Sequence, residues 1–361
     1  MKDFHATPYD AGTLTKLELY RSYLQSWLPV WLMQSGKSQT ITIADFFAGP
    51  GCDDEGTPGS PLVALKVVRQ FTRRIAESAA KVHLAFNDSD AAKSHSLGEL
   101  LKKQDVPTTL CTWDVSTLDF EEAFRRSLPH LTQGPNLLLL DQQGISFITP
   151  AVFRRLMTLP KTDFIFFIAS STLRRFEEHP SIRRHLPLSA GAITAKSFND
   201  THRAVHEYYK TIAQETQDEF YVGRFSIRKG SNIYGLIFGS AHLRGIEKFV
   251  RACWRLDPER GEANFDIDKD HIDKTMPSLY PELDVPKKLQ LFQDELRRRI
   301  TEGEFPNDGS IFVTCIENGF LPKHGKHVLR ELIKRGELTV VGGQPRVSPD
   351  GVKNPRLLKV F

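Results

Sequence analysis

The sequence predicts a doubly wound α/β sheet of mostly parallel strands, followed by a small winged helix-turn-helix unit. Five short apolar segments are typical of strands, and a segment of helical periodicity follows each of the first four. Apolar runs without strict alternation indicate strands that are buried on both faces of a parallel sheet. The second unit is predicted by three helical segments and a terminal hairpin after residue 286.

The composition is that of an ordinary globular chain of 361 residues. Hydrophobic residues make up 40% and charged residues 25%, which excludes a disordered or fibrous chain. No apolar run is long enough to cross a bilayer, and the first 15 residues lack the apolar core of a secretory signal. Four scattered cysteines form no CxxC pair, so we expect reduced thiols in a cytoplasmic protein and no metal site.

Strands and helices are expected to alternate along the first half of the chain. An amphipathic helix is predicted over 15–32, and a strand over 40–47 leads into a glycine-rich turn. Helices are then expected at 61–77, 90–104, 120–131 and 150–159, and strands at 82–87, 108–113, 136–141 and 162–169. Because a helix joins each strand to the next, these strands are expected to form one Rossmann-like sheet covered on both faces.

The alternation ends after residue 169. Residues 174–219 are charged and helical, and we expect them as an insertion over the site. Two strands, 221–227 and 233–239, flank the turn RKGSN and predict an antiparallel hairpin at the sheet edge. A helix over 242–254 closes the first domain, which is expected to span residues 1–255.

The last third of the chain is expected to contain a linker and a second domain. Residues 256–285 are interrupted by three prolines and predict the linker. Residues 286–361, with helices at 287–301, 310–318 and 322–335, predict the winged helix-turn-helix domain. This domain has 14 Lys and Arg against 9 Asp and Glu, an excess of five, whereas the whole chain carries only +4. A polyanionic partner and a solvated basic surface both explain the excess.

Polar residues follow the predicted carboxyl ends of four strands, where open α/β sheets bind their ligands. These residues are Asp45 with the loop residues Ala48, Gly49 and Gly51; Asn87 and Asp88; Asp114; and Asp141, Gln142, Gln143 and Gly144. The loop is not GxGxxG, so a single-nucleoside cofactor such as S-adenosylmethionine fits better than a dinucleotide. An Asp at a strand end also caps the following helix, and for any one residue this alternative stays open.

Each strand end has an expected role toward such a cofactor. Asn87 or Asp88 is placed to accept hydrogen bonds from ribose hydroxyls, and Asp114 from the adenine amino group. Asp141 and the two glutamines are expected to face the substrate. Methyl transfer from a sulfonium needs little acid–base chemistry, because positioning of the acceptor supplies most of the acceleration.

These residues resemble the three-Cys-motif partner proteins (TcmP), a family of bacterial and phage proteins with a methyltransferase-like Rossmann fold. The similarity lies in residues 45–51 (DFFAGPG), 59–65 (GSPLVAL), 15–24 (TKLELYRSYL) and 233–245, and in the Asp-x-x-Gly that begins at Asp141. It implies a class I methyltransferase-like sheet, S-adenosylmethionine as cofactor and methyl transfer to nucleic acid. It also implies a protein partner with the three-cysteine motif, and a role in phage defence or mobile-element modification.

The chain departs from this resemblance at the catalytic motif. Residues 141–144 occupy the place of an Asp-Pro-aromatic-Gly motif, in which the aromatic ring stacks on an extruded base. Asp141 can still hold an amine, and the glutamines can bond a base edge. Phe147 is a candidate for the missing ring, although a core phenylalanine is the simpler interpretation. The alternative to a methyltransferase is a binding or scaffold protein with an altered active site.

Basic residues in two segments are candidates for nucleic-acid contact. The expected contacts are Arg174 and Arg175 after the fifth strand, and Lys323, Lys326, His327 and Arg330 on the presumed recognition helix. His324 is expected on the exposed surface of the same helix. A solvated helix face or a protein-docking module are the alternatives. A hydrolase is not expected, because neither an HxH cluster nor a P-loop GxxxxGK[ST] occurs.

Overall fold

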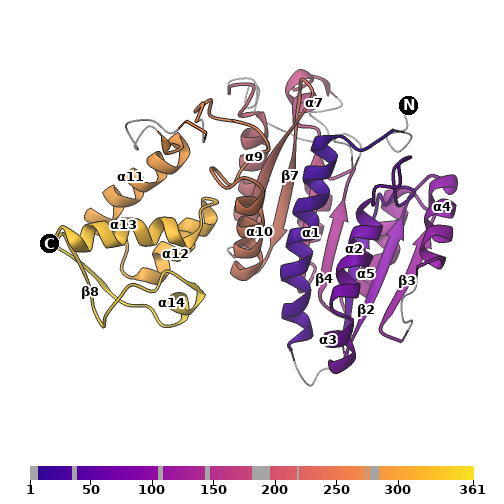
Figure 1. Ribbon diagram of the computed structural model, residues 1–361, viewed down its shortest axis with the longest axis horizontal. Helices are drawn as coiled ribbons and strands as arrows, with labels where there is room; N and C mark the ends of the chain where they lie inside the picture. Colours follow the sequence, from indigo (N-terminus) through magenta and orange to yellow (C-terminus); the bar gives the residue numbers. More distant parts are fainter. Residues whose placement is uncertain are drawn as a thin grey trace. The chain divides into compact units, whose positions relative to one another are not determined.

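The computed structural model describes residues 7–34, 39–104, 109–142, 147–180, 196–217, 219–272, 275–276 and 284–361. The chain divides into two compact units, Met1–Lys248 and Phe249–Phe361, and the division falls inside helix α10 (Leu243–Leu256). Figure 1 shows the sheet of the first unit and the small helical second unit. None of the described helices is long and apolar enough to span a lipid bilayer.

Among the described residues of the first unit, a seven-stranded sheet has the order β3-β2-β1-β4-β5-β7-β6. Strands β1 to β5 are parallel, whereas β7 lies antiparallel between β5 and β6. The bounds are β1 (Gln39–Asp45), β2 (Ala80–Asn87), β3 (Cys111–Ser116), β4 (Asn136–Leu140), β5 (Thr162–Ile168), β6 (Tyr221–Lys229) and β7 (Asn232–Ser240). The fold is the predicted doubly wound α/β sheet. Its strand order reverses between β1 and β4, which is where such sheets bind ligands.

The helices of the first unit follow the predicted pattern, with two differences. They are α1 (Ala11–Leu32), α2 (Ser60–Gln70), α3 (Thr72–Glu77), α4 (Ala91–Lys102), α5 (Phe120–Leu131), α6 (Pro150–Met157), α7 (Ser170–Arg175) and α9 (Thr201–Thr216). Helix α1 begins four residues earlier than predicted, because the Asp10 carboxylate accepts from the Thr13 amide and caps it. The helix predicted over 61–77 is broken at Phe71, whose backbone leaves the helical region.

Helix α1 is fixed to the sheet by buried side chains. Tyr20, Tyr23 and Trp27 of α1 are at most 2% exposed. The Tyr23 hydroxyl donates a 2.6 Å hydrogen bond to Oδ2 of Asp163 in β5. This contact fixes the middle of α1 at the end of the sheet opposite the strand switch, so the first turns of α1 extend toward the switch.

The second unit has the predicted winged helix-turn-helix order. It contains α11 (Lys287–Thr301), α12 (Asp308–Glu317), α13 (Pro322–Lys334), β8 (Leu338–Val340), α14 (Pro349–Lys353) and β9 (Leu358–Val360), with β8 and β9 antiparallel. Gly325 allows α13 to approach α12 closely, because a Cβ there would lie 2.5 Å from Cys315 Sγ. The short helix α14 was not predicted, and the Ser348 hydroxyl caps it.

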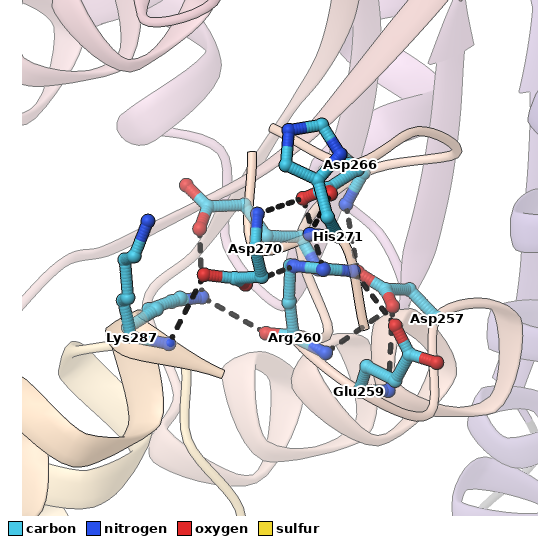
Figure 2. Close-up of polar contacts among 10 residues, drawn as sticks. Asp257, Glu259, Arg260, Asp266, Asp270, His271 and Lys287 are labelled. Atoms are coloured by element: carbon cyan, nitrogen blue, oxygen red, sulfur yellow. Dashed lines mark hydrogen bonds and ion pairs between the residues drawn. The ribbon is translucent and has the colours of Figure 1, made fainter. Parts of the chain in front are cut away.

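Within the segment where the sequence predicts a linker, residues 257–272 fold around the buried side chain of Arg260 (Figure 2). Its guanidinium forms ion pairs with Glu259 at 2.8 Å and with Asp266 and Asp270, each at 2.9 Å. The Asp257 carboxylate accepts hydrogen bonds from four backbone amides between residues 259 and 263. Ion pairing and backbone capping therefore give this segment a defined structure without a helix or strand.

The same segment is joined to the first turn of α11. The Lys288 ammonium donates to the Arg260 carbonyl at 3.0 Å and forms a 2.9 Å ion pair with buried Glu262. The Lys287 amide donates to Asp270 Oδ1 at 3.3 Å (Figure 2). Because three polar contacts bind it to α11, this segment belongs to the second unit.

Candidate functional site

Asp45 is the last residue of β1 and is only 1% exposed. Its carboxylate accepts a 2.6 Å hydrogen bond from the Ser60 hydroxyl and a 2.9 Å bond from the Phe47 amide. Burial raises the pKa of Asp45 to about 7, and nearby Asp141 adds to this effect, whereas the two hydrogen bonds oppose it. Asp45 therefore ties the end of β1 to the first turn of α2.

The loop after β1 is fixed by its own backbone amides. The Ala48 amide donates to the Asn87 carbonyl and the Gly49 amide to Asp88 Oδ2, both at 2.9 Å. Gly49 and Gly51 have positive φ values of 62° and 95°. A Cβ on Gly51 would also lie 2.9 Å from two leucine side chains of α4. The positive φ value favours glycine at position 51, and a larger residue would also have to displace the two leucine side chains.

Asn87 and Asp88 are the two alternatives for the ribose acceptor. They differ in burial and in the hydrogen bonds that they make within the protein. Asn87 is buried, and its amide group bonds the Phe46 and Leu118 carbonyls, the Leu118 amide and the Ser116 hydroxyl. Asp88 is half-buried and, from the part of the chain that the structure describes, accepts two hydrogen bonds of 2.9 Å, from the Gly49 and Asp90 amides. A carboxylate has about four acceptor positions, so Asp88 retains capacity for a ligand.

Asp114 lies inside β3, two residues before the strand ends at Ser116. The prediction that this strand ends at Trp113 is wrong. Asp114 pairs in register with Ala85, so it projects to the sheet face opposite to that of Asp45, which pairs with Phe86. Its half-exposed carboxylate lies 2.7 Å from Nε2 of His83. The adenine role of Asp114 stays a prediction.

Asp141 follows β4 directly, and its Oδ2 accepts a hydrogen bond from the Lys16 ammonium of α1. The two side chains are 23% and 12% exposed. Lys16 Nζ also lies 4.8 Å from the centroid of the Phe167 ring in β5. Sequence reasoning missed Lys16, since its position beside an apolar helical stripe does not indicate which strand end it faces.

The segment after Asp141 is described only in part. Gln142 is 1% exposed, and its Oε1 accepts from the amides of Phe147 at 2.9 Å and Ile148 at 3.3 Å. Its Nε2 is buried and has no hydrogen-bond partner in the described part of the chain. Gln143 and Gly144, the other two predicted catalytic residues, lie outside the described residues.

An aromatic cluster lies next to this segment. Phe147 is 38% exposed, so its interpretation as a core phenylalanine is wrong. Its ring centroid lies 5.3 Å from that of Phe47 in the loop after β1, and 5.7 Å from that of Phe120 at the start of α5. An exposed aromatic ring is thus held near Asp45 and Gln142 by two other rings.

The basic residues at the end of α7 bond to the protein itself. The Arg174 guanidinium donates to the carbonyls of Lys196 at 2.8 Å and Ser197 at 3.2 Å. Arg175 Nη2 donates to the Asn232 side chain at 3.5 Å. A contact of either residue with a phosphate stays a prediction.

Helix α13 presents basic side chains on one face and buries apolar ones on the other. Lys323, His327 and Arg330 are exposed and Lys326 is half-buried, whereas Val328, Leu329 and Leu332 are buried. Glu331, the acidic residue among them, forms a 2.7 Å ion pair with Arg297 of α11. The exposed face of α13 therefore keeps a positive charge.

His324 is an exception on this helix. The side chain is 6% exposed, and its ring lies 4.4 Å from that of Trp254. Burial, together with the positive charge of Lys323, lowers the pKa of His324 to about 4. The prediction that His324 lies on the exposed surface is therefore wrong. Among the described residues, no group of three or more His, Cys, Asp or Glu is arranged to hold a metal ion.

Residues 266–343 match the family model of the GMT-like wHTH domain, which confirms the predicted winged helix. The match begins within the segment around Arg260. No curated protein sequence matches the chain significantly.

A comparison with solved structures finds similarity to several methyltransferases. The human methyltransferase 10 domain containing protein is 10% identical, with a TM-score of 0.31 over 63% of this chain and 82% of that one. The N-terminal domain of human METTL16 in complex with SAH is 10% identical, with a TM-score of 0.32 over 63% and 70%. A putative O-methyltransferase from Klebsiella pneumoniae is 14% identical, with a TM-score of 0.31 over 64% and 90%. At these identities and TM-scores, the similarity assigns no activity to this chain.

Proposed function

We propose that this chain is an S-adenosylmethionine-dependent methyltransferase that acts on nucleic acid. The observation that supports this most is the grouping of Asp45, the glycine loop, Asp88 and Asp141 at the strand switch. Gly49 is hydrogen-bonded to Asp88, and the charge of Asp141 acts on Asp45, so the ends of β1, β2 and β4 meet there. In doubly wound sheets this edge is where a nucleotide-like ligand binds.

The side chains at this edge suit the parts of an adenosyl cofactor. Asp88 has acceptor capacity for ribose hydroxyls, and Phe47 and Phe147 offer apolar ring surface. When bound, the cofactor supplies a methyl group on an activated sulfonium. The chain has only to position the acceptor and exclude water, so catalysis does not require a dedicated base.

Nucleic acid is the proposed substrate because of two surfaces. The basic face of α13 suits phosphates, and the winged helix places such a helix against a duplex. In the first unit, exposed Phe147 takes the place of the aromatic residue missing from residues 141–144, and would stack on an extruded base. The resemblance adds a partner protein with a three-cysteine motif and a role in phage defence or mobile-element modification.

Methyl transfer can be tested directly with tritiated S-adenosylmethionine and four substrates: duplex DNA, single-stranded DNA, duplex RNA and transfer RNA. We expect label in one of these classes, and a loss of at least tenfold when Phe147 is replaced by Ala. The matched control is Phe176→Ala, which removes another exposed ring of the first unit. Equal rates for both variants would contradict the role of Phe147.

The second candidate is a binding or scaffold protein that no longer transfers methyl groups. It is favoured by the loop amides of residues 47–49, which all donate within the protein, and by Gln142 and Gln143 in the motif. Calorimetry with S-adenosylhomocysteine separates the candidates in part. Cofactor binding without transfer to any substrate, with or without a partner, would favour the scaffold.

A further inference from the structure

The contact between Lys16 and Asp141 joins two residues that are 125 positions apart. Lys16 lies in the second turn of α1, and Asp141 follows β4 at the point where the strand order reverses. Both side chains keep part of their surface exposed, 12% for Lys16 and 23% for Asp141. A positive and a negative group therefore lie together at the edge that the proposed cofactor would occupy.

The ion pair is not needed to fix α1 to the sheet. The buried hydrogen bond between Tyr23 and Asp163 does this in the middle of the helix. A 2.7 Å ion pair between Asp10 and Lys229 holds its first turn against β6. A further ion pair with partly exposed side chains contributes little to stability. The pair of Lys16 and Asp141 therefore calls for a functional explanation.

The residues before Lys16 also approach the glycine loop. The Tyr9 amide donates a 2.8 Å hydrogen bond to Asp53, and the Tyr9 hydroxyl lies near Gly59, where a Cβ would be 3.1 Å from it. Burial raises the pKa of Tyr9, as do the charges of Asp53, Asp141 and Asp45. Tyr9 in the N-terminal segment therefore lies close enough to Asp45 and Asp141 for their charges to affect it.

S-Adenosylmethionine carries an amino-acid end with a carboxylate and an ammonium group on the same carbon. A lysine and an aspartate held side by side present the complementary pair of charges. A ligand with both charges can replace the contact of each side chain at once, so neither is left without a partner. A ligand with one charge would leave Lys16 or Asp141 unpaired, which disfavours it, and an uncharged ligand would gain no ionic contact from the pair.

We propose that Lys16 and Asp141 together bind the amino-acid end of the cofactor, Lys16 its carboxylate and Asp141 its ammonium group. This inference rests on the proposed function. It assigns the amine-holding capacity of Asp141 to the cofactor, and leaves Phe147 and the segment after Asp141 to the methyl acceptor. It also makes α1 part of the binding site.

The test compares two ligands that differ in this end alone. S-Adenosylhomocysteine has the amino-acid end, whereas 5′-methylthioadenosine has a methyl group in its place. Binding of each to the full chain is measured by calorimetry for the wild type and for Lys16→Met, Lys16→Arg and Asp141→Asn. Lys66→Met, which changes an exposed lysine on α2, is the matched control. Thermal unfolding checks that each variant is folded.

We expect the wild type to bind S-adenosylhomocysteine at least tenfold more tightly than 5′-methylthioadenosine. Lys16→Met and Asp141→Asn should each remove most of that preference without changing the affinity for 5′-methylthioadenosine, and Lys16→Arg should keep it. Equal wild-type affinities for the two ligands, or equal losses for both in Lys16→Met, would overturn the inference but not the proposed function. Failure of the folded wild type to bind either ligand at millimolar concentration would overturn both.

Discussion

The Asp88 carboxylate accepts a 2.9 Å hydrogen bond from the Gly49 amide, and so connects the end of β2 to the loop after β1. Its other oxygen accepts from the Asp90 amide at 2.9 Å, just before α4 begins. One side chain therefore positions the glycine loop, the end of β2 and the start of α4. Asn87, the residue before it, links the same region to the end of β3 through Ser116.

Replacing Asp88 by Ala should weaken both the fold and cofactor binding. Loss of the carboxylate leaves the Gly49 amide without its acceptor, which costs about 1–3 kcal/mol. We expect the affinity for S-adenosylhomocysteine to fall at least tenfold in calorimetry, because the variant also loses the proposed ribose acceptor. Asp54→Ala, at an exposed position of the same loop region, is the control. Unchanged affinity in a folded Asp88→Ala variant would exclude Asp88 from the site.

Asp45 should make stability depend on pH. Burial raises its pKa from 3.8 to about 7, so the folded chain keeps a proton that the unfolded chain loses near pH 4. The protonated Asp45 carboxyl makes its full contribution to the free energy of unfolding below pH 4. This contribution is lost as the pH rises through about 7. Relative to wild type, Asp45→Asn should therefore gain stability between pH 5 and pH 8, by at most about 4 kcal/mol.

Urea unfolding of both proteins at several pH values measures this difference. Asp54→Asn, at an exposed position, should show no such trend. A difference between wild type and Asp45→Asn that stays constant from pH 5 to pH 8 would show that Asp45 does not titrate in this range.

Arg260 should be essential to the start of the second unit (Figure 2). Arg260→Leu leaves Asp266 and Asp270 without their buried partner, and breaking a buried ion pair on one side costs about 3–5 kcal/mol. Hydrogen exchange should become at least 100-fold faster at amides of α11, which this segment contacts through Lys288. Lys334→Ala, an exposed change on α13, should leave exchange in α11 unchanged. Unaltered protection in Arg260→Leu would mean that this segment does not support α11.

The basic face of α13 should determine the salt dependence of nucleic-acid binding. Each phosphate contact contributes roughly one unit to the slope of log affinity against log salt. The double variant Lys326→Ala and Arg330→Ala should therefore lower the slope by about two for a labelled 30-base-pair duplex. Arg298→Ala is the control, because Arg298 is already paired with Glu295 and Glu302 on α11. Equal slopes for the wild type and the double variant would favour a protein-docking role for α13.

The sequence was sufficient to predict the sheet, because apolar strands that alternate with helices leave few arrangements. Features of the structure that depend on contacts between segments far apart in the sequence were predicted less well. Asp114 was placed at a strand end, but β3 continues to Ser116 through its pairing with β2. The hydrophobic pattern of β3 alone does not show how many of its residues pair with β2. It therefore does not predict where the strand ends.

Neither the role of Lys16 nor the exposure of Phe147 could be predicted from the sequence, and the reason is the same for both. Lys16 reaches Asp141 because α1 is fixed to the sheet by Tyr23 and Asp10, whose partners Asp163 and Lys229 are far away in sequence. Phe147 is exposed because its amide is held by Gln142 and its ring by Phe47, and neither contact follows from local periodicity. By contrast, Asp45 and Gly49 were recognisable, since a buried strand that ends in a glycine turn is a local pattern.

The central claim is that an adenosyl ligand binds at the joined ends of β1, β2 and β4. A crystal structure of the full chain grown with millimolar S-adenosylhomocysteine tests it most directly. The account predicts ligand density in contact with Asp88 and Asp141, beside the loop of Gly49. Density at any other place on the chain, or crystals that contain no ligand under these conditions, would contradict it.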